Sequence, residues 1–176
     1  MFIGHLVLVG LPGAGKSTVG RAVARKLRRR FVDFDTELEL REGKTVPELF
    51  AERGEPAFRA LEVALTRELA NTEPSVFSPG GGWITNPHVV ELIRPPGRII
   101  HLRVSPAAAL KRLGSARVSR PLLMESDPAA VLDRLWALRE RLYASADGEV
   151  DTEVVDFQHV ADKVVLLAQA LDAGLA

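Results

Sequence analysis

The stretch HLVLVGLPGAGKST, residues 5–18, decides the fold of this chain. Its first half is a short apolar run that ends at a glycine, which is typical of a fully buried strand. From residue 16 to residue 28 apolar side chains recur at helical spacing. Between strand and helix, four residues fit the pattern G-x-x-x-x-G-K-[ST]: Gly10, Gly15, Lys16 and Ser17. The sequence therefore predicts a phosphate-binding loop in its usual strand–loop–helix context.

This loop predicts a bound nucleoside triphosphate, ATP, together with Mg²⁺. Glycines let backbone N–H groups curl around phosphate oxygens, and a helix N-terminus adds positive potential. We expect Lys16 to reach the β- and γ-phosphates and the Ser17 hydroxyl to bind Mg²⁺. The expected nucleotide-binding residues of the loop are Gly13, Ala14, Gly15, Lys16, Ser17 and Thr18.

Strands and helices alternate along the rest of the chain. This alternation predicts an α/β fold, a three-layer α/β/α sandwich around a five-stranded parallel sheet, in one domain over residues 1–176. Together with the phosphate loop, we expect this to be a P-loop NTPase fold of the nucleoside monophosphate kinase-like type, with a mobile lid at about 113–124. The expected further strands are 30–35, 75–78, 98–104 and 149–151. The expected further helices are 36–41, 46–51, 55–70, one that begins at Asn86–Pro87, 106–113, 128–143 and 157–171.

Composition excludes several classes of function. The chain has 23 Lys and Arg against 23 Asp and Glu, so we expect neither a nucleic acid nor a membrane surface as partner. It has no cysteine, which removes disulfides and thiolate chemistry, and its four histidines share no metal-ligand spacing. The apolar run near the start is too short to span a bilayer, and we expect a cytoplasmic protein.

Two aspartates end the second predicted strand. Asp33 and Asp35 flank Phe34, so strand alternation puts both carboxylates on one face, beside the phosphate loop. One could hold a metal-bound water, and the other could accept a hydroxyl proton from a phosphoryl acceptor. The alternative is that they cap a helix beginning at Thr36, since Asp is a good N-cap.

A second glycine run and three arginines carry further signals. Gly80, Gly81 and Gly82 stand side by side after the third strand, either as a close approach to a ligand or as a tight turn. Arg59 and Arg139 each lie on a predicted helix and, taken alone, fit a solvent-facing position equally well. Arg120 lies at the end of a Gly-, Ser- and Arg-rich loop, where an arginine could reach a transferring phosphoryl group.

Taken together, these stretches resemble the shikimate kinase family over nearly the whole chain, from about Leu6 to Asp151. The residues that carry the resemblance stand in this order: LVGLPGAGKSTVGRAVARKL (8–27), FVDFD (31–35), VPELFAERGEPAFRALE (46–62), SPGGGW (78–83), SRPLL (119–123) and RERLY (139–143). The phosphate loop alone is shared by many proteins, but its combination with the other five is far more specific.

The resemblance implies how an acceptor would bind. Asp35 would contact the shikimate hydroxyls and take the proton, and Arg59 with Arg139 would grip the shikimate carboxylate. Gly81 would donate its backbone N–H, with Gly80 and Gly82 allowing close approach. The helical segment 34–62 would form the substrate-binding part of the domain.

It also implies how the nucleotide end is built. Asp33 would lie near Mg²⁺ through water, beside Ser17. Lys16 and Arg120 would stabilise the transferring phosphoryl group. Arg117 would contribute in the lid, and Arg112 would lie against the adenine.

The expected function is thus transfer of the ATP γ-phosphoryl group to the 3-hydroxyl of shikimate, in aromatic amino-acid biosynthesis, by a monomer. Two alternatives remain open on the residues alone. One is a related kinase that acts on gluconate or a nucleoside monophosphate, and the other is a non-catalytic nucleotide-binding module.

Overall fold

The computed structural model describes residues 4–114, 123, 127–153 and 156–174. Within these ranges five strands form one sheet in the order β2-β3-β1-β4-β5, and every pair of neighbours is parallel. The strands are β1 (Leu6–Val9), β2 (Phe31–Asp33), β3 (Val76–Ser78), β4 (Arg98–Arg103) and β5 (Gly148–Asp151). The predicted five-stranded parallel sheet is confirmed, and the phosphate loop leaves its central strand.

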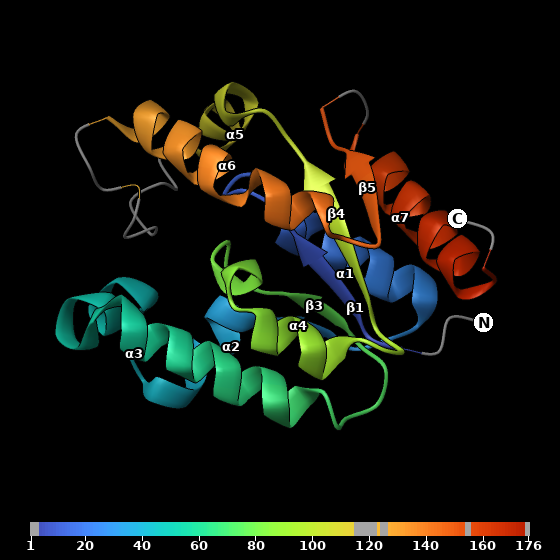
Figure 1. Cartoon of the computed structure of the whole chain (residues 1–176), viewed down its shortest axis with the longest axis horizontal. Coiled ribbons are helices and arrows are strands. Elements are labelled where there is room, and N and C mark those ends of the chain that lie inside the picture. Colours follow the sequence, from blue (N-terminus) through green and yellow to red (C-terminus); the bar gives the residue numbers. More distant parts are fainter. Residues whose placement is uncertain (1–3, 115–122, 124–126, 154–155, 175–176) are drawn as a thin grey trace.

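Helices cover both faces of the sheet (Figure 1). α1 packs against α7 on one side, while α4 and α6 lie on the other side, with α3 packed against α4 and α5 against α6. The helices are α1 (Lys16–Leu27), α2 (Phe34–Glu42), α3 (Val46–Leu69), α4 (Pro87–Ile93), α5 (Pro106–Leu113), α6 (Pro128–Ala144) and α7 (Phe157–Asp172). The three-layer sandwich is therefore as predicted.

Capping residues explain where the helices begin. Thr45 and Glu48 form a reciprocal capping box at the start of α3, in which the Thr45 N–H donates to Glu48 Oε2 over 2.7 Å. Ser105 and Asp127 cap α5 and α6, each followed by a proline at the first helical position. α3 contains a kink at Gly54, with φ 77°, and this kink separates the two helices that were predicted for this stretch.

The region of the two aspartates corrects one prediction. β2 ends at Asp33 and α2 begins at Phe34, so Asp35 lies in the first turn of a helix and not in a strand. Asp33 is the N-cap of α2 and its side chain accepts from the Thr36 N–H over 3.4 Å. The alternation argument was wrong because a good N-cap residue ended the strand two residues early.

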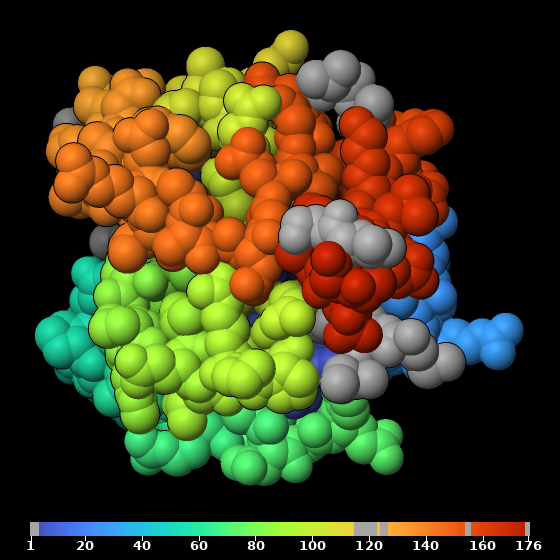
Figure 2. Space-filling model, turned by 45° about the vertical axis from the view of Figure 1, so that its right-hand side comes forward, coloured from blue at the N-terminus to red at the C-terminus, as the bar shows by residue number. Residues whose placement is uncertain are grey.

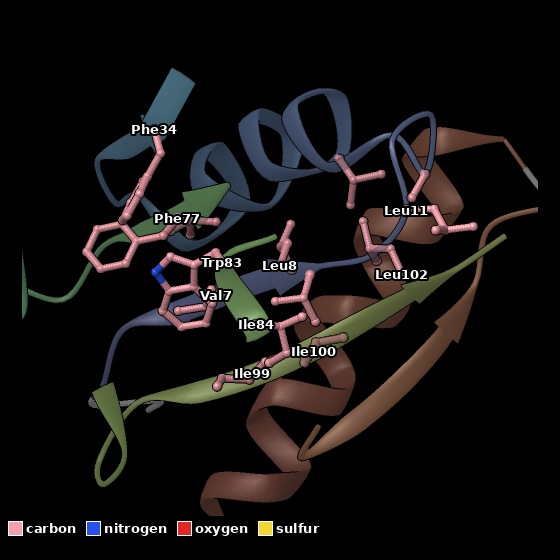
Figure 3. Close-up of a cluster of buried hydrophobic side chains, with 14 of the residues drawn as sticks. Val7, Leu8, Leu11, Phe34, Phe77, Trp83, Ile84, Ile99, Ile100 and Leu102 are labelled. Carbon is pink, nitrogen blue, oxygen red and sulfur yellow. The ribbon is translucent and has the colours of Figure 1, made fainter. Parts of the chain in front are cut away.

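The core fills both sides of the sheet, and its part on the α4–α6 side fixes the turn after β3. Figure 3 shows Trp83 beside Val7, with Phe77 and Phe34 next to it and the β4 isoleucines below. Trp83 is 1% exposed, and its indole N–H donates to Thr66 Oγ1 in α3 over 2.9 Å. This hydrogen bond ties the triple-glycine turn to α3. The outer surface on this side is formed by α4 and α6, which adjoin in Figure 2.

The described residues include no helix that combines the length and the apolar character needed to cross a membrane.

Candidate active site

The phosphate loop opens toward a cavity at the carboxyl ends of the strands. Gly15, the residue before α1, has φ 88°, a left-handed conformation that suits glycine. No side chain caps α1, so its first backbone N–H groups are left for a ligand. Lys16 is 8% exposed, and its ammonium donates to the carbonyl oxygens of Gly10 (3.0 Å) and Leu11 (3.1 Å). The loop therefore holds its lysine against its own backbone.

A cluster of oxygen atoms lies next to the loop. The Ser17 hydroxyl donates a hydrogen bond to Asp33 Oδ2, and it lies 3.4 Å from the hydroxyl oxygen of Ser78. Ser78 comes from the end of β3, where it pairs in register with Asp33. Within the described ranges, no group of three or more His, Cys, Asp or Glu residues could hold a metal ion. Hydroxyl and carboxylate oxygens are the kind of ligand that a hard cation such as Mg²⁺ prefers.

The cavity above the loop has a volume of about 380 Å³. Its lining includes most of the residues predicted for nucleotide and metal: Gly13, Gly15, Lys16, Ser17, Thr18, Asp33 and Arg112. Asp35, predicted for the acceptor, lines it as well. At its outer end the Arg112 guanidinium lies 5.6 Å from the centre of the Phe157 ring. Thr152 fixes Arg112 through two hydrogen bonds, one of them 2.8 Å long to its hydroxyl. Ala14, also predicted here, is fully buried in the loop.

A second cavity adjoins the first. Its apolar wall consists of Pro12, Val46, Phe50, Phe58 and Leu123, and its polar wall of Asp35, Arg59, Gly80, Gly81, Gly82 and Arg139. All six residues predicted for the acceptor thus come together around one space, although they derive from α2, α3, α6 and the turn after β3.

Arg59 is held by two carboxylates of its own helix. Its Nη1 lies 2.6 Å from Glu62 Oε2 and its Nη2 2.7 Å from Glu55 Oε1. Burial lowers the pKa of Arg59, but the attraction of Glu62 and Glu55 outweighs it and raises the pKa above its ordinary value. Glu62 is 1% exposed, and burial raises its pKa against the opposing effect of Arg59. Glu62 therefore holds Arg59 in a fixed orientation from below.

Arg139 differs from Arg59 in its partners. It is 5% exposed, and no ion pair joins it to any residue in the described ranges. Its Nη1 is 3.1 Å from the point that a Cβ atom on Gly81 would occupy. A buried guanidinium in the wall of a cavity can bind the carboxylate of a ligand through two parallel N–H groups.

Asp35 is the one described residue that lines both cavities. Asp35 lines the cavity above the phosphate loop, and it also lines the second cavity together with Arg59, Arg139 and the triple glycine. A carboxylate at such a junction can accept a proton from a group that reacts with a bound phosphate.

The structure adds residues that the sequence reasoning missed. Ser78 and Phe157 line the first cavity, and Glu62 supports Arg59 in the second. Glu62 had a usable signal, because it stands three residues after Arg59 on a predicted helix. Arg117 and Arg120, and with them most of the predicted lid at 113–124, lie outside the described residues.

Comparisons with known proteins agree with this geometry. The family model described as shikimate kinase matches residues 12–168. A shikimate kinase from Nitrobacter winogradskyi is 40% identical over 96% of this chain and 79% of its own length. One from Pelotomaculum thermopropionicum is 37% identical over 92% of this chain and 93% of its own. The solved structure of a shikimate kinase from Acinetobacter baumannii in complex with shikimate superposes with a TM-score of 0.91 at 33% identity, covering 96% of this chain and 94% of that one.

The match spans the phosphate loop, both cavities and the last helix, and it favours a shikimate kinase over the two alternatives that the residues alone left open. The chain belongs to the shikimate kinase family, whose members are kinases that phosphorylate shikimate with ATP.

Proposed function

We propose that the two cavities are the nucleotide and acceptor halves of one site, in which Asp35 accepts the proton of the shikimate 3-hydroxyl while the γ-phosphoryl group of ATP is transferred. The observation that carries this assignment is the position of Asp35, whose side chain lines both cavities. The shikimate complex of the Acinetobacter baumannii relative supports shikimate as the small-molecule acceptor.

In the nucleotide half, the backbone N–H groups at the start of α1 bind phosphate oxygens. Lys16 turns from the carbonyl oxygens of Gly10 and Leu11 to the phosphates and neutralises charge on the transferring group. Arg112 and Phe157 offer a guanidinium plane and an aromatic ring to the adenine. Arg117 and Arg120, which lie outside the described residues, remain predicted ligands of the phosphates.

The oxygen cluster fits Mg²⁺. The Ser17 hydroxyl would bind the ion, and Asp33 would hold Ser17 and a water of the ion. Mg²⁺ supplies charge neutralisation on the phosphate oxygens. Asp33 keeps its second oxygen on the Thr36 N–H, so the same carboxylate fixes the start of α2 and thereby the direction of Asp35.

In the acceptor half, Arg59 and Arg139 bind the shikimate carboxylate from two sides. Gly81 donates its backbone N–H, and Gly80 and Gly82 keep that backbone accessible. The cavity encloses about 50 Å³ in this structure, well below the roughly 300–1,000 Å³ of ordinary ligand pockets. We propose that the side chains around this cavity move apart when shikimate binds.

The transfer itself forms one bond and breaks another. The 3-hydroxyl oxygen of shikimate bonds to the γ-phosphorus, its proton goes to Asp35, and the bond from the γ-phosphorus to the β,γ-bridging oxygen breaks, which releases ADP. Positioning and charge neutralisation supply the rate enhancement. We propose that the enzyme acts as a monomer, as the family resemblance implies.

The test is ADP release from Mg-ATP in the presence of shikimate, gluconate, AMP or no acceptor. We expect release that depends on shikimate. Equal release with gluconate or AMP, or release without any acceptor, would overturn the assignment of the second cavity and leave the phosphate loop unaffected.

A further inference from the structure

Tyr143 is a buried side chain for which the reaction described above has no use. It lies in α6 one turn after Arg139 and is 2% exposed. Its hydroxyl is buried and completes no hydrogen bond of standard geometry with a described residue. A buried phenol oxygen that completes no such hydrogen bond costs stability, so a phenylalanine would fit this position better on packing grounds alone.

The ring of Tyr143 is held by a second unusual side chain. His101 on β4 is 1% exposed and stacks on Tyr143, with ring centres 4.5 Å apart and an angle of 6° between the planes. The imidazole is itself fixed, because its Nδ1 lies 2.9 Å from Glu149 Oε2 on the neighbouring strand β5. α6 lies against β4 along this contact (Figure 1). The phenol hydroxyl therefore has a defined position.

Arg139 is the charged group that acts on this hydroxyl. Burial raises the pKa of Tyr143, and the Arg139 guanidinium opposes the effect through its charge and through a hydrogen-bonding contact that falls short of standard geometry. Arg139 also lines the acceptor cavity beside Gly81, whereas Tyr143 is not part of the lining. Arg139 thus takes part in the wall of the acceptor cavity and also interacts with Tyr143.

We propose that Tyr143 is a positioning residue that orients the Arg139 guanidinium toward the acceptor carboxylate. The inference rests on the proposed function, in which Arg139 binds that carboxylate. On binding, the phenol oxygen accepts one guanidinium N–H, and the remaining N–H groups face the ligand. Because His101 and Glu149 fix the ring, the guanidinium cannot turn away. Catalytic hydrogen bonds of this kind often close only in the complex.

Tyr143→Phe tests the proposal because it removes the hydroxyl and keeps the ring. We expect the dissociation constant for shikimate, measured by calorimetry, to rise roughly 2- to 12-fold, the usual worth of one hydrogen bond. Turnover at saturating shikimate and the affinity for ATP should not change. The melting temperature should stay equal or rise, because a buried oxygen that completes no hydrogen bond of standard geometry is lost. If Tyr143 had only a structural role, its substitution would not weaken shikimate binding while the melting temperature stays equal or rises.

Trp136→Phe is the matched control. Trp136 belongs to the same aromatic cluster, with its ring centre 6.1 Å from that of His101, but it offers no hydroxyl to Arg139. Shikimate affinity should stay at the wild-type value in this variant. A loss as large as that in Tyr143→Phe would assign the effect to packing and overturn the proposal.

A double-mutant cycle separates this proposal from the proposed function. Arg139→Met keeps an apolar stem and removes the guanidinium, and in that background Tyr143→Phe should cause no further loss of shikimate affinity. If Arg139→Met alone leaves shikimate affinity intact, the carboxylate assignment fails and this inference fails with it. If Arg139→Met weakens binding but Tyr143→Phe has no effect, or has the same effect in both backgrounds, only the role of Tyr143 is overturned.

Discussion

A Cβ atom on Gly82 would lie 2.2 Å from Nη2 and 2.3 Å from Cζ of Arg59. The guanidinium therefore rests directly on the backbone of the triple-glycine turn, at a distance that no other residue type allows. Trp83 anchors the same turn to α3, the helix that carries Arg59. The turn and the arginine are thus two parts of one rigid wall of the acceptor cavity.

Gly82→Ala should weaken shikimate binding and spare ATP binding. Gly82 has φ −89° and ψ −8°, which alanine adopts freely, so the whole effect comes from the collision with Arg59. A displaced Arg59 loses its contact with the carboxylate, and a hydrogen bond to a charged group is worth about 1.5–3 kcal/mol, so the KM for shikimate should rise roughly 12- to 150-fold. Steady-state kinetics with each substrate varied in turn measures it.

Gly43→Ala is the contrasting variant. Gly43 has φ 65° and no atom within 4 Å of an added Cβ, so alanine there strains the backbone without touching either cavity. It should lower the melting temperature and leave the KM for shikimate unchanged. A similar rise in KM in both variants would mean that general destabilisation, and not Arg59, sets the value.

Arg59→Lys should raise the KM for shikimate at least about tenfold with little effect on ATP. Lysine still neutralises the buried Glu62, so the fold is preserved, but it lacks the planar fork that matches a carboxylate. Arg41→Lys is the control, since Arg41 also binds two carboxylates, Glu37 and Glu68, outside both cavities. A collapse of ATP affinity in Arg59→Lys would refute its assignment to the acceptor.

Asp33→Asn should raise the Mg²⁺ concentration needed for half-maximal activity. Asparagine remains a good N-cap for α2 but loses the negative charge that holds Ser17 beside the ion. Loss of such a supporting partner changes metal affinity or activity by roughly 10- to 100-fold. Asp33→Ala should show the same Mg²⁺ effect and in addition lose about 1 kcal/mol of stability with the cap. An unchanged Mg²⁺ requirement in both variants would exclude Asp33 from the metal site.

Acidification should destabilise the protein through its buried histidines. Burial lowers the pKa of His5 and of His101 below 6.5, so both are neutral in the folded state at pH values where the unfolded chain takes up a proton. The unfolded state then binds more protons, and stability falls as the pH drops below about 6.5 toward the folded pKa values.

His101→Phe isolates this effect, because phenylalanine keeps the stack on Tyr143 but does not titrate. Denaturant unfolding at pH 7.5 and at pH 5.5 should show a smaller loss of stability for the variant than for the wild type. The other titratable groups, including Glu62, are present in both proteins, so their contributions to the pH dependence cancel in the comparison. Equal losses would mean that His101 is not held neutral by the fold.

The arrangement of elements could be predicted because each element has its own sequence signal. Proline or a cap residue marks the starts of α3, α5 and α6, and apolar runs mark the strands. The residue at which β2 ends could not be predicted from the sequence. An acidic residue after two strand residues is equally compatible with a strand that continues and with a helix N-cap. In the structure Asp33 is the N-cap of α2, and Asp35 therefore lies in that helix.

The set of acceptor residues could be predicted because the family motifs name residues that are distant in sequence. The structure brings these residues together around one cavity. Ser78 and Phe157 have no comparable local signal. Ser78 reaches the loop only because the sheet order places β3 between β1 and β2, and Phe157 reaches Gly15 only because α7 packs on α1. Both facts belong to the tertiary structure.

The most direct test of the account is the turnover of Asp35→Asn. Asparagine keeps the size and hydrogen-bonding capacity of the side chain but cannot take the hydroxyl proton, so kcat should fall by roughly 100- to 10,000-fold. ATP affinity should stay intact because the phosphate loop is unchanged, and Glu37→Gln on the same helix should behave like the wild type. Turnover of Asp35→Asn close to the wild-type value would contradict the claim that Asp35 joins the two halves of the site chemically.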